Sequence, residues 1–195
     1  MPFYRCMTAG GSGGGFEPSI QGVPFDTEII RLPFTLNANY QITVDFEVDT
    51  YVSNMNIVGN NNGSYAYFNL TEYDNKYSTS PASGSYTGIN FEGTLTGRHE
   101  FMFNDADNHI LFDEVVVKNN GTAVVVNPAS FPTIYYTIGW RNNTDFAGKI
   151  YRYTIYDKVN EQTVCDLKPY MNTDGALCLY DEVNHKIYTP QKRIK

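Results

Sequence analysis

The sequence predicts an all-β protein, an antiparallel sandwich of two sheets, from three observations. Tyr and Phe are abundant, with 16 and 12 residues among 195, and aromatic side chains favour pleated, half-buried surfaces. Apolar and polar residues alternate along several short segments, which is the pattern of a strand with one buried face. Asn, Asp and Gly cluster between these segments, where tight hairpin turns require them.

The clearest alternation runs from Gln41 to Asp49, where every second side chain is apolar. Further strands are expected at residues 65–73, 98–103, 135–140 and 151–156. In the last of these, strict alternation would place Tyr151 on the same face as Tyr153 and Ile155. The sequence has no clear amphipathic helix and no evident internal repeat.

Charge and hydropathy restrict the classes of partner. The net charge is −7, and the clustered basic residues are confined to Lys192, Arg193 and Lys195 at the end of the chain. Nucleic-acid binding needs a basic surface, so we expect no nucleic-acid partner. No apolar run reaches the ~20 residues of a membrane span, and the start lacks the apolar core of a signal peptide. We therefore expect that the chain is made in a cytoplasm and does not insert into a membrane.

The three cysteines are too few for a disulfide framework. Cys165 and Cys178 could lie on neighbouring strands, where a bridge between them is geometrically possible. We favour the alternative, in which both are buried free thiols.

The first 24 residues differ in composition from the rest of the chain. Gly10 to Gly15 has the composition of a flexible linker. The preceding segment carries three apolar side chains, Phe3, Tyr4 and Met7. We interpret residues 1–24 as an anchor arm and linker whose apolar side chains dock on another subunit, and residues 25–195 as the sandwich. The alternative is a frayed terminus.

The last fifty residues hold the most specific motifs, at Gly148 to Asp157, Asp166 to Pro169 and Asp174 to Thr189. They resemble the closing strands of laminin-G-like domains of the concanavalin A-like lectin and glucanase superfamily, as found in phage and prophage proteins of gut bacteria. In that family a GKIYS-x-KIYD strand and a DLVP strand precede a DG-x-x-x-LYD-x-VN-x-K-x-YT hairpin. The resemblance implies a jelly-roll sandwich, but a widely used fold does not define an activity.

No catalytic pattern stands out, so we do not expect an enzyme. Asp45, Glu47 and Asp49 share one strand face but do not match the Glu-x-Asp-x-x-Glu pattern of the glycan hydrolases of this superfold. We expect them to lie on a solvated outer face. The Gly-x-Ser-x-Gly sequence at Gly10 to Gly14 lies in the linker, without the strand and helix that a nucleophile elbow needs.

One loop has the composition of a calcium site, with Asp105, Asp107 and Asn108 close in sequence. Calcium takes six to eight oxygen ligands, often from such loops. We favour the alternative of a hairpin turn organised by an Asp side chain. No cofactor is required by any other feature of the sequence.

A carbohydrate site would need aromatic faces beside hydrogen-bonding groups. The candidate aromatic and amide side chains are Tyr65, Tyr67, Tyr86, Tyr135, Trp140, Asn142 and Asn143. The alternative is that these aromatic side chains fill the core or a protein interface.

These features together predict a structural protein of a bacteriophage virion, made in the host cytoplasm without a signal peptide. It would be a capsid decoration, head fibre or tail component, present in several copies or as a homo-oligomer. The arm would contact other virion proteins, and the lectin-like sandwich would attach to host-surface or mucosal glycans. The alternatives are a free carbohydrate-binding module or bacterial surface adhesin and, third, a glycoside hydrolase.

Overall fold

The structure is a computed structural model of the chain. It describes residues 15–26, 28–35, 39–50, 55–60, 66–71, 76–79, 87–90, 96–103, 105–107, 109–119, 135–138 and 147–192, some of them by their backbone alone. These residues form strands and turns, so the prediction of an all-β chain is confirmed for them. The same residues include no helix that is long and apolar enough to cross a membrane.

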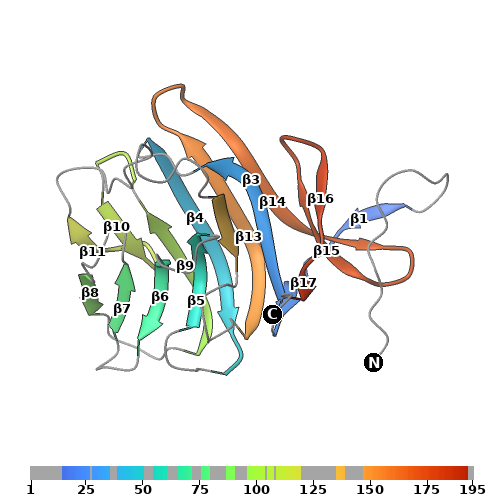
Figure 1. The fold of residues 1–195 in the computed structure, drawn as a ribbon, viewed down its shortest axis with the longest axis horizontal. Coiled ribbons are helices and arrows are strands. Elements are labelled where there is room, and N and C mark those ends of the chain that lie inside the picture. Colours follow the sequence, from blue (N-terminus) through green and yellow to red (C-terminus); the bar gives the residue numbers. More distant parts are fainter. Residues whose placement is uncertain are drawn as a thin grey trace.

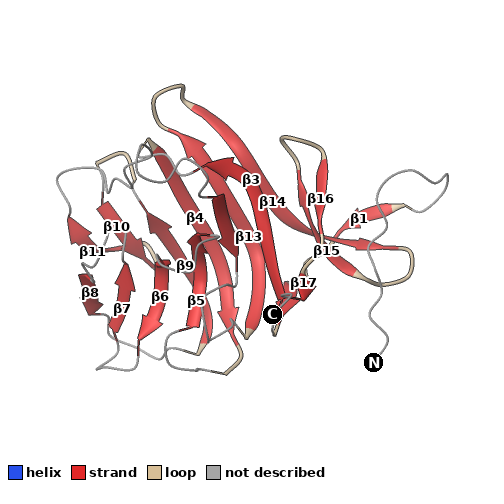
Figure 2. Ribbon diagram, viewed as in Figure 1, coloured by secondary structure: helices blue, strands red, loops and turns tan. Residues whose placement is uncertain are grey.

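The strands pair antiparallel into two sheets (Figures 1 and 2). The first sheet has ten strands. Eight follow one another in the order β11 (Val115–Asn119), β10 (His109–Phe112), β9 (Gly97–Phe103), β4 (Tyr40–Val48), β13 (Gly148–Asp157), β14 (Gln162–Asn172), β15 (Leu177–Asp181) and β16 (Lys186–Tyr188). The other two are β1 (Phe16–Pro18), which pairs with β14, and β2 (Val23–Phe25), which pairs with β13.

The second sheet has seven strands. Their order is β17 (Gln191–Lys192), β3 (Glu28–Thr35), β12 (Tyr135–Ile138), β5 (Met55–Asn60), β6 (Ala66–Thr71), β7 (Lys76–Thr79) and β8 (Thr87–Asn90). In Figure 1, β1, β15 and β16 extend to the right beyond this sheet. The outer part of the ten-stranded sheet therefore projects past its neighbour.

Both sheets contribute to one hydrophobic core. The core cluster joins Leu32 of β3 and Ile57 of β5 to Phe46, Phe101 and Tyr153 of the ten-stranded sheet. Burial alternates along β4 as predicted, because its even-numbered apolar side chains face this core and its other side chains do not. Cys165 and Cys178 are both buried and are not joined in a disulfide, as favoured from the sequence, and burial raises the pKa of the Cys165 thiol.

The prediction for Tyr151 is wrong because β13 contains a β-bulge. Ile150 pairs with Phe46, and Arg152 pairs with the next β4 residue, Asp45. Tyr151 is therefore an extra residue that reverses the alternation, as bulges do. Ile150 and Tyr153 are fully buried, whereas Tyr151 and Arg152 both lie on the opposite face.

β13 and β14 diverge, and the N-terminal segment fills the space between them. β14 pairs with β13 only as far as Leu167. Beyond that point β2 pairs with Gly148–Ile150 of β13, and β1 pairs with Tyr170–Asn172 of β14. Residues of the predicted linker from Phe16 onward are thus part of the sheet. The apolar arm side chains Phe3, Tyr4 and Met7 lie outside the described residues, so their anchor role stays a prediction.

Two hairpin turns share the sequence Tyr-Asp-x-Val-Asn, a short repeat that the sequence analysis missed. They are named the Asp-Val-Asn turns below. In the turn after β13, Asp157 Oδ1 accepts hydrogen bonds from the backbone N–H of Val159 at 2.9 Å and Asn160 at 3.1 Å. Asp157 Oδ2 accepts one from Asn160 Nδ2 at 2.8 Å. The chain then passes through Glu161 with φ of 50°, the left-handed conformation that lets a short hairpin close.

The turn after β15 has the same construction. Asp181 accepts hydrogen bonds from Val183 N at 3.0 Å, Asn184 N at 3.2 Å and Asn184 Nδ2 at 2.8 Å, and His185 has φ of 53°. Asp181 also accepts a hydrogen bond from Asp166 N at 3.2 Å. It is fully buried, so this carboxylate joins the turn to the neighbouring strand β14.

We expect Asp181→Asn to lower the free energy of unfolding by about 1–3 kcal/mol. The new amide nitrogen would face Asn184 Nδ2 in a buried site, and both groups are hydrogen-bond donors. Asn184 Nδ2 also donates to Val164 O at 2.8 Å, so its amide cannot rotate away without losing that bond. Asp157→Asn is the matched control. Asp157 accepts one hydrogen bond fewer than Asp181, so we expect a smaller loss of stability from this variant. Urea denaturation measures both, and equal losses would contradict this account of the second turn.

Candidate binding face on the ten-stranded sheet

The outer face of the ten-stranded sheet, which is the face turned away from the core, is rich in charged and tyrosine side chains. They form two clusters. The Arg98 cluster comprises Asp45, Glu47, Asp49, Arg98, Lys149 and Tyr151. The Tyr170–Tyr180 strip comprises Arg152, Asp166, Lys168, Tyr170, Tyr180, Glu182 and His185.

In the Arg98 cluster, a cation joins three strands. The Arg98 guanidinium of β9 binds Asp45 of β4 through two hydrogen bonds, of 2.9 and 2.7 Å. The same guanidinium lies 3.9 Å from the ring centroid of Tyr151 in β13, a favourable cation–π contact. Tyr151 in turn donates its hydroxyl to Glu47 at 2.6 Å. The bulge makes this arrangement possible, because it directs Tyr151 to the outer face.

Lys149 completes the pairing of the acidic residues on β4. Its Nζ donates to Glu47 Oε1 at 2.6 Å and to Asp49 Oδ1 at 3.1 Å. Hydrogen bonds from Lys149 and then Tyr151 lower the pKa of Glu47. A general acid in a glycosidase needs the opposite, a raised pKa. The electrostatics of Glu47 are those of an ion-pair partner on an outer face.

Glu100 differs from these carboxylates. It faces Asp45 across the β9–β4 pair, and its pKa is raised by burial and then by Asp45 and Glu114. Its side chain is nevertheless exposed. A carboxylic acid that works as a proton donor is usually held in an apolar pocket, so we interpret Glu100 as a carboxylate crowded by acidic neighbours.

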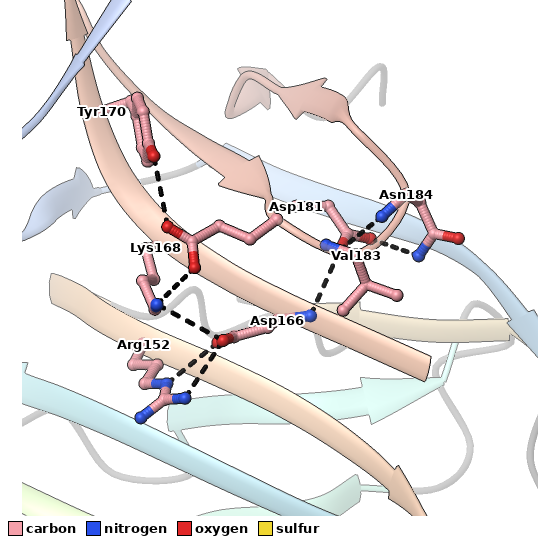
Figure 3. A network of polar contacts seen from close by, with 8 residues as sticks. Arg152, Asp166, Lys168, Tyr170, Asp181, Val183 and Asn184 are labelled. Carbon is pink, nitrogen blue, oxygen red and sulfur yellow. Dashed lines mark hydrogen bonds and ion pairs between the residues drawn. The ribbon is translucent and has the colours of Figure 1, made fainter. Parts of the chain in front are cut away.

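The Tyr170–Tyr180 strip begins with a chain of ion pairs (Figure 3). Arg152 binds Asp166 through hydrogen bonds of 2.9 and 3.1 Å. Lys168 lies 3.5 Å from Asp166 and also pairs with Glu182. Arg152 comes from β13, Asp166 and Lys168 from β14, and Glu182 from the turn after β15. The charges of the strip are thus paired across three neighbouring segments.

The aromatic part of the strip is a pair of tyrosines. The ring centroids of Tyr170 and Tyr180 are 4.8 Å apart, with the rings inclined by 50°. Tyr170 donates its hydroxyl to Glu182 Oε1 at 3.2 Å, and the Tyr180 hydroxyl lies 3.0 Å from His185 Nδ1. Burial and the hydrogen bond to Glu182 raise the pKa of Tyr170. Both rings are therefore held in place at the ring contact and at the hydroxyl.

The carbohydrate-binding residues predicted from the sequence are not tested by the structure. Tyr65, Tyr86, Trp140, Asn142 and Asn143 lie outside the described residues, and Tyr67 and Tyr135 are described by their backbone alone. Sequence reasoning did not single out Tyr170 and Tyr180. The signal was the alternation of Asp166, Lys168 and Tyr170 along β14, which places a tyrosine on the same face as two charges.

The loop with the predicted calcium ligands forms the turn that we favoured. Asp105 Oδ1 accepts hydrogen bonds from the backbone N–H of Asp107 at 2.9 Å and His109 at 2.7 Å, and its Oδ2 lies 3.1 Å from His109 Nδ1. Among the described residues, no group of three or more Asp, Glu, His or Cys side chains is placed to hold a metal. Asn108 lies outside the described residues, so calcium binding stays a prediction.

Comparison with family models, curated proteins and solved structures finds no match to this chain. Its function must therefore be argued from the described residues and from the motifs of the last fifty residues.

The Arg98 cluster also packs against the N-terminal segment. Gly22 lies in the loop between β1 and β2, where a Cβ atom would be 2.8 Å from Lys149 Cβ and 2.9 Å from Tyr151 Cζ. The Tyr151 ring cannot easily move aside, because Arg98 and Glu47 hold it. Glycine is thus required where this loop crosses the outer face.

We expect Gly22→Ala to reduce the free energy of unfolding by about 1–3 kcal/mol, the usual cost of overpacking. Gly15→Ala is the control, since a Cβ there meets no atom within 4 Å. Thermal or urea denaturation measures both variants. A Gly22→Ala variant as stable as Gly15→Ala would show that the loop does not pack against Lys149 and Tyr151.

Proposed function

We propose that the chain is a structural protein of a bacteriophage virion. It is a capsid decoration, head fibre or tail component whose jelly-roll, laminin-G-like sandwich is held by the N-terminal arm. The outer face and turns of the sandwich then remain free to contact glycans of the host surface. Two antiparallel sheets that share one core support the jelly-roll assignment, and the motifs of the last fifty residues support the virion assignment.

The main support for the proposal is the position at which the N-terminal segment joins the sheet. β1 pairs with the last three residues of β14. The two Asp-Val-Asn turns lie toward the opposite end, because the first precedes Gln162 and the second binds Val164 O (Figure 1). β14 has 11 residues, which corresponds to about 35 Å. Attachment through residues 1–14 would therefore leave the turn-bearing end uncovered.

Two exposed apolar side chains lie close to β1. Ile20, in the loop after β1, is 96% exposed, and Met171, which pairs with Glu17 of β1, is 37% exposed. Exposed apolar groups beside a docking segment suit an interface. We propose that they extend the contact made by the arm on a neighbouring virion protein.

The sandwich acts by binding, not by catalysis. The carboxylates Asp45, Glu47 and Asp49 are engaged by Arg98 or Lys149. Paired charges and half-buried tyrosines offer many donors and acceptors with some apolar surface, which suits a hydroxyl-rich ligand. The same face supports the alternative of a free carbohydrate-binding module, in which the arm would have no docking role.

Deletion of residues 1–14 tests the docking role of the arm. We expect the truncated chain to keep the melting temperature of the full chain, because the described strands begin at Phe16, and to be lost from purified particles. Quantitative mass spectrometry of virions grown with each version measures incorporation. Undiminished incorporation would exclude anchoring by the arm and favour the free module.

Ile20→Lys tests the apolar contact beside the arm. We expect severalfold lower incorporation with unchanged thermal stability, because the side chain is almost fully exposed in the isolated chain. Val159→Lys is the control, since Val159 is also exposed, at 67%, but lies in the first Asp-Val-Asn turn. Equal incorporation of both variants would contradict an interface around Ile20.

A further inference from the structure

The Tyr170–Tyr180 strip has the features of a saccharide platform. We infer that it is the glycan-contacting site of the sandwich and that its ligand is a neutral oligosaccharide. This inference rests on the proposed function and deepens it by naming the site and the ligand chemistry. Three properties of the strip support it: the fixed position of the rings, their partial exposure to solvent and the charge balance around them.

The two rings are preorganised. Tyr170 is tethered to Glu182 and Tyr180 contacts His185 through its hydroxyl, and the rings touch each other. Tyr180 and Lys168 form a registered pair of β15 and β14, so the platform stands on regular strands and not on a loop. A site whose side chains are already ordered loses less entropy on binding. Sugar C–H groups pack on such aromatic surfaces, and the surrounding polar groups bind the hydroxyls.

Tyr151 provides a comparison on the same face. Its ring is covered by the Arg98 guanidinium at 3.9 Å and by the backbone at Gly22. The cation–ring contacts of the described residues lie on Tyr151 and Tyr188, not on Tyr170 or Tyr180. A sugar would have to displace Arg98 to reach Tyr151. All three tyrosines are half-buried, so the tyrosine pair differs from Tyr151 in having rings that no cation of the described residues covers.

The charges around the pair point to a neutral ligand. Arg152 and Lys168 are matched by Asp166 and Glu182, with cation–carboxylate contacts in each case. The side chains of Arg152, Lys168 and Glu182 are 53%, 36% and 35% exposed. They keep donors and acceptors in reach of solvent without an excess of either charge. A charged sugar would have to break one of these pairs, whereas hydroxyl groups can bind both kinds of partner.

The dimensions of the strip suit a short oligosaccharide. Its residues come from β13, β14, β15 and the turn after β15. One strand spacing of about 5 Å separates Lys168 of β14 from Tyr180 of β15, and Arg152 of β13, which reaches Asp166 of β14, lies one strand further on. We expect one unit to lie on the tyrosine pair and the next to approach Lys168 and Arg152.

Saturation-transfer difference NMR on the full chain tests the inference, with lactose, maltotriose, cellotriose, chitotriose and the acidic sialyllactose as probes. We expect binding of at least one neutral probe. Tyr170→Ala and Tyr180→Ala should each weaken it by about tenfold, the value of one aromatic contact. Tyr180→Phe should retain most of the binding, because it keeps the ring and loses only the hydroxyl contact to His185.

Tyr156→Ala is the matched control, a half-buried tyrosine of β13 that pairs with Thr163, far along β14 from Tyr170. It should bind as the unaltered chain does, and melting curves confirm that each variant is folded. Three results would overturn the inference: binding that survives a folded Tyr170→Ala/Tyr180→Ala variant, binding of sialyllactose alone, or binding of no probe. Incorporation of that double variant into virions is measured separately, so failure of this site is distinguished from failure of the virion assignment.

Discussion

The divergence of β13 and β14 determines how the N-terminal segment joins the ten-stranded sheet. Two paired strands that separate leave backbone donors and acceptors without partners, and buried groups of this kind are costly. Residues 16–25 supply the missing partners, with β2 on β13 and β1 on β14. Val23 and Phe25 enter the core at the same time. The segment that follows the predicted arm is therefore held by hydrogen bonds and by burial, and the position of β1 on the sheet is fixed.

The β-bulge at Tyr151 shapes the outer face next to this divergence. It turns Tyr151 toward Glu47 and Arg98, beneath the loop that holds Gly22. Tyr151 thereby packs against the N-terminal segment and stabilises its position. Farther along, β14 and β15 extend past the seven-stranded sheet (Figure 1), and their outer face carries the Tyr170–Tyr180 pair instead. The same residue type thus has a structural use on β13 and, in our proposal, a binding use on β14 and β15.

The sequence predicted the features that depend on one strand or one turn. The alternation in β4 and the turn at Asp105 are confirmed, because side-chain period and Asp-centred turns are local properties. The sequence could not predict on which face of the sheet Tyr151 lies. A bulge arises from the register between two strands, here β13 and β4, and that register is not visible in β13 alone. The pairing of residues 16–25 is also non-local. In sequence this segment resembles a linker, because it contains Gly and Pro. Tyr170 and Tyr180 became candidates only when the register joined β14 to β15.

In our proposal the chain is mounted through its N-terminal segment, with the outer face turned to solvent. Electron cryomicroscopy of virions that carry the chain would show which part of the domain contacts the particle. We expect density for a two-sheet domain on the particle surface, with the Phe16 end of β1 against the particle and the Tyr170–Tyr180 strip open to solvent. A domain whose outer face packs on the particle, or one attached through the Asp-Val-Asn turns, would contradict it.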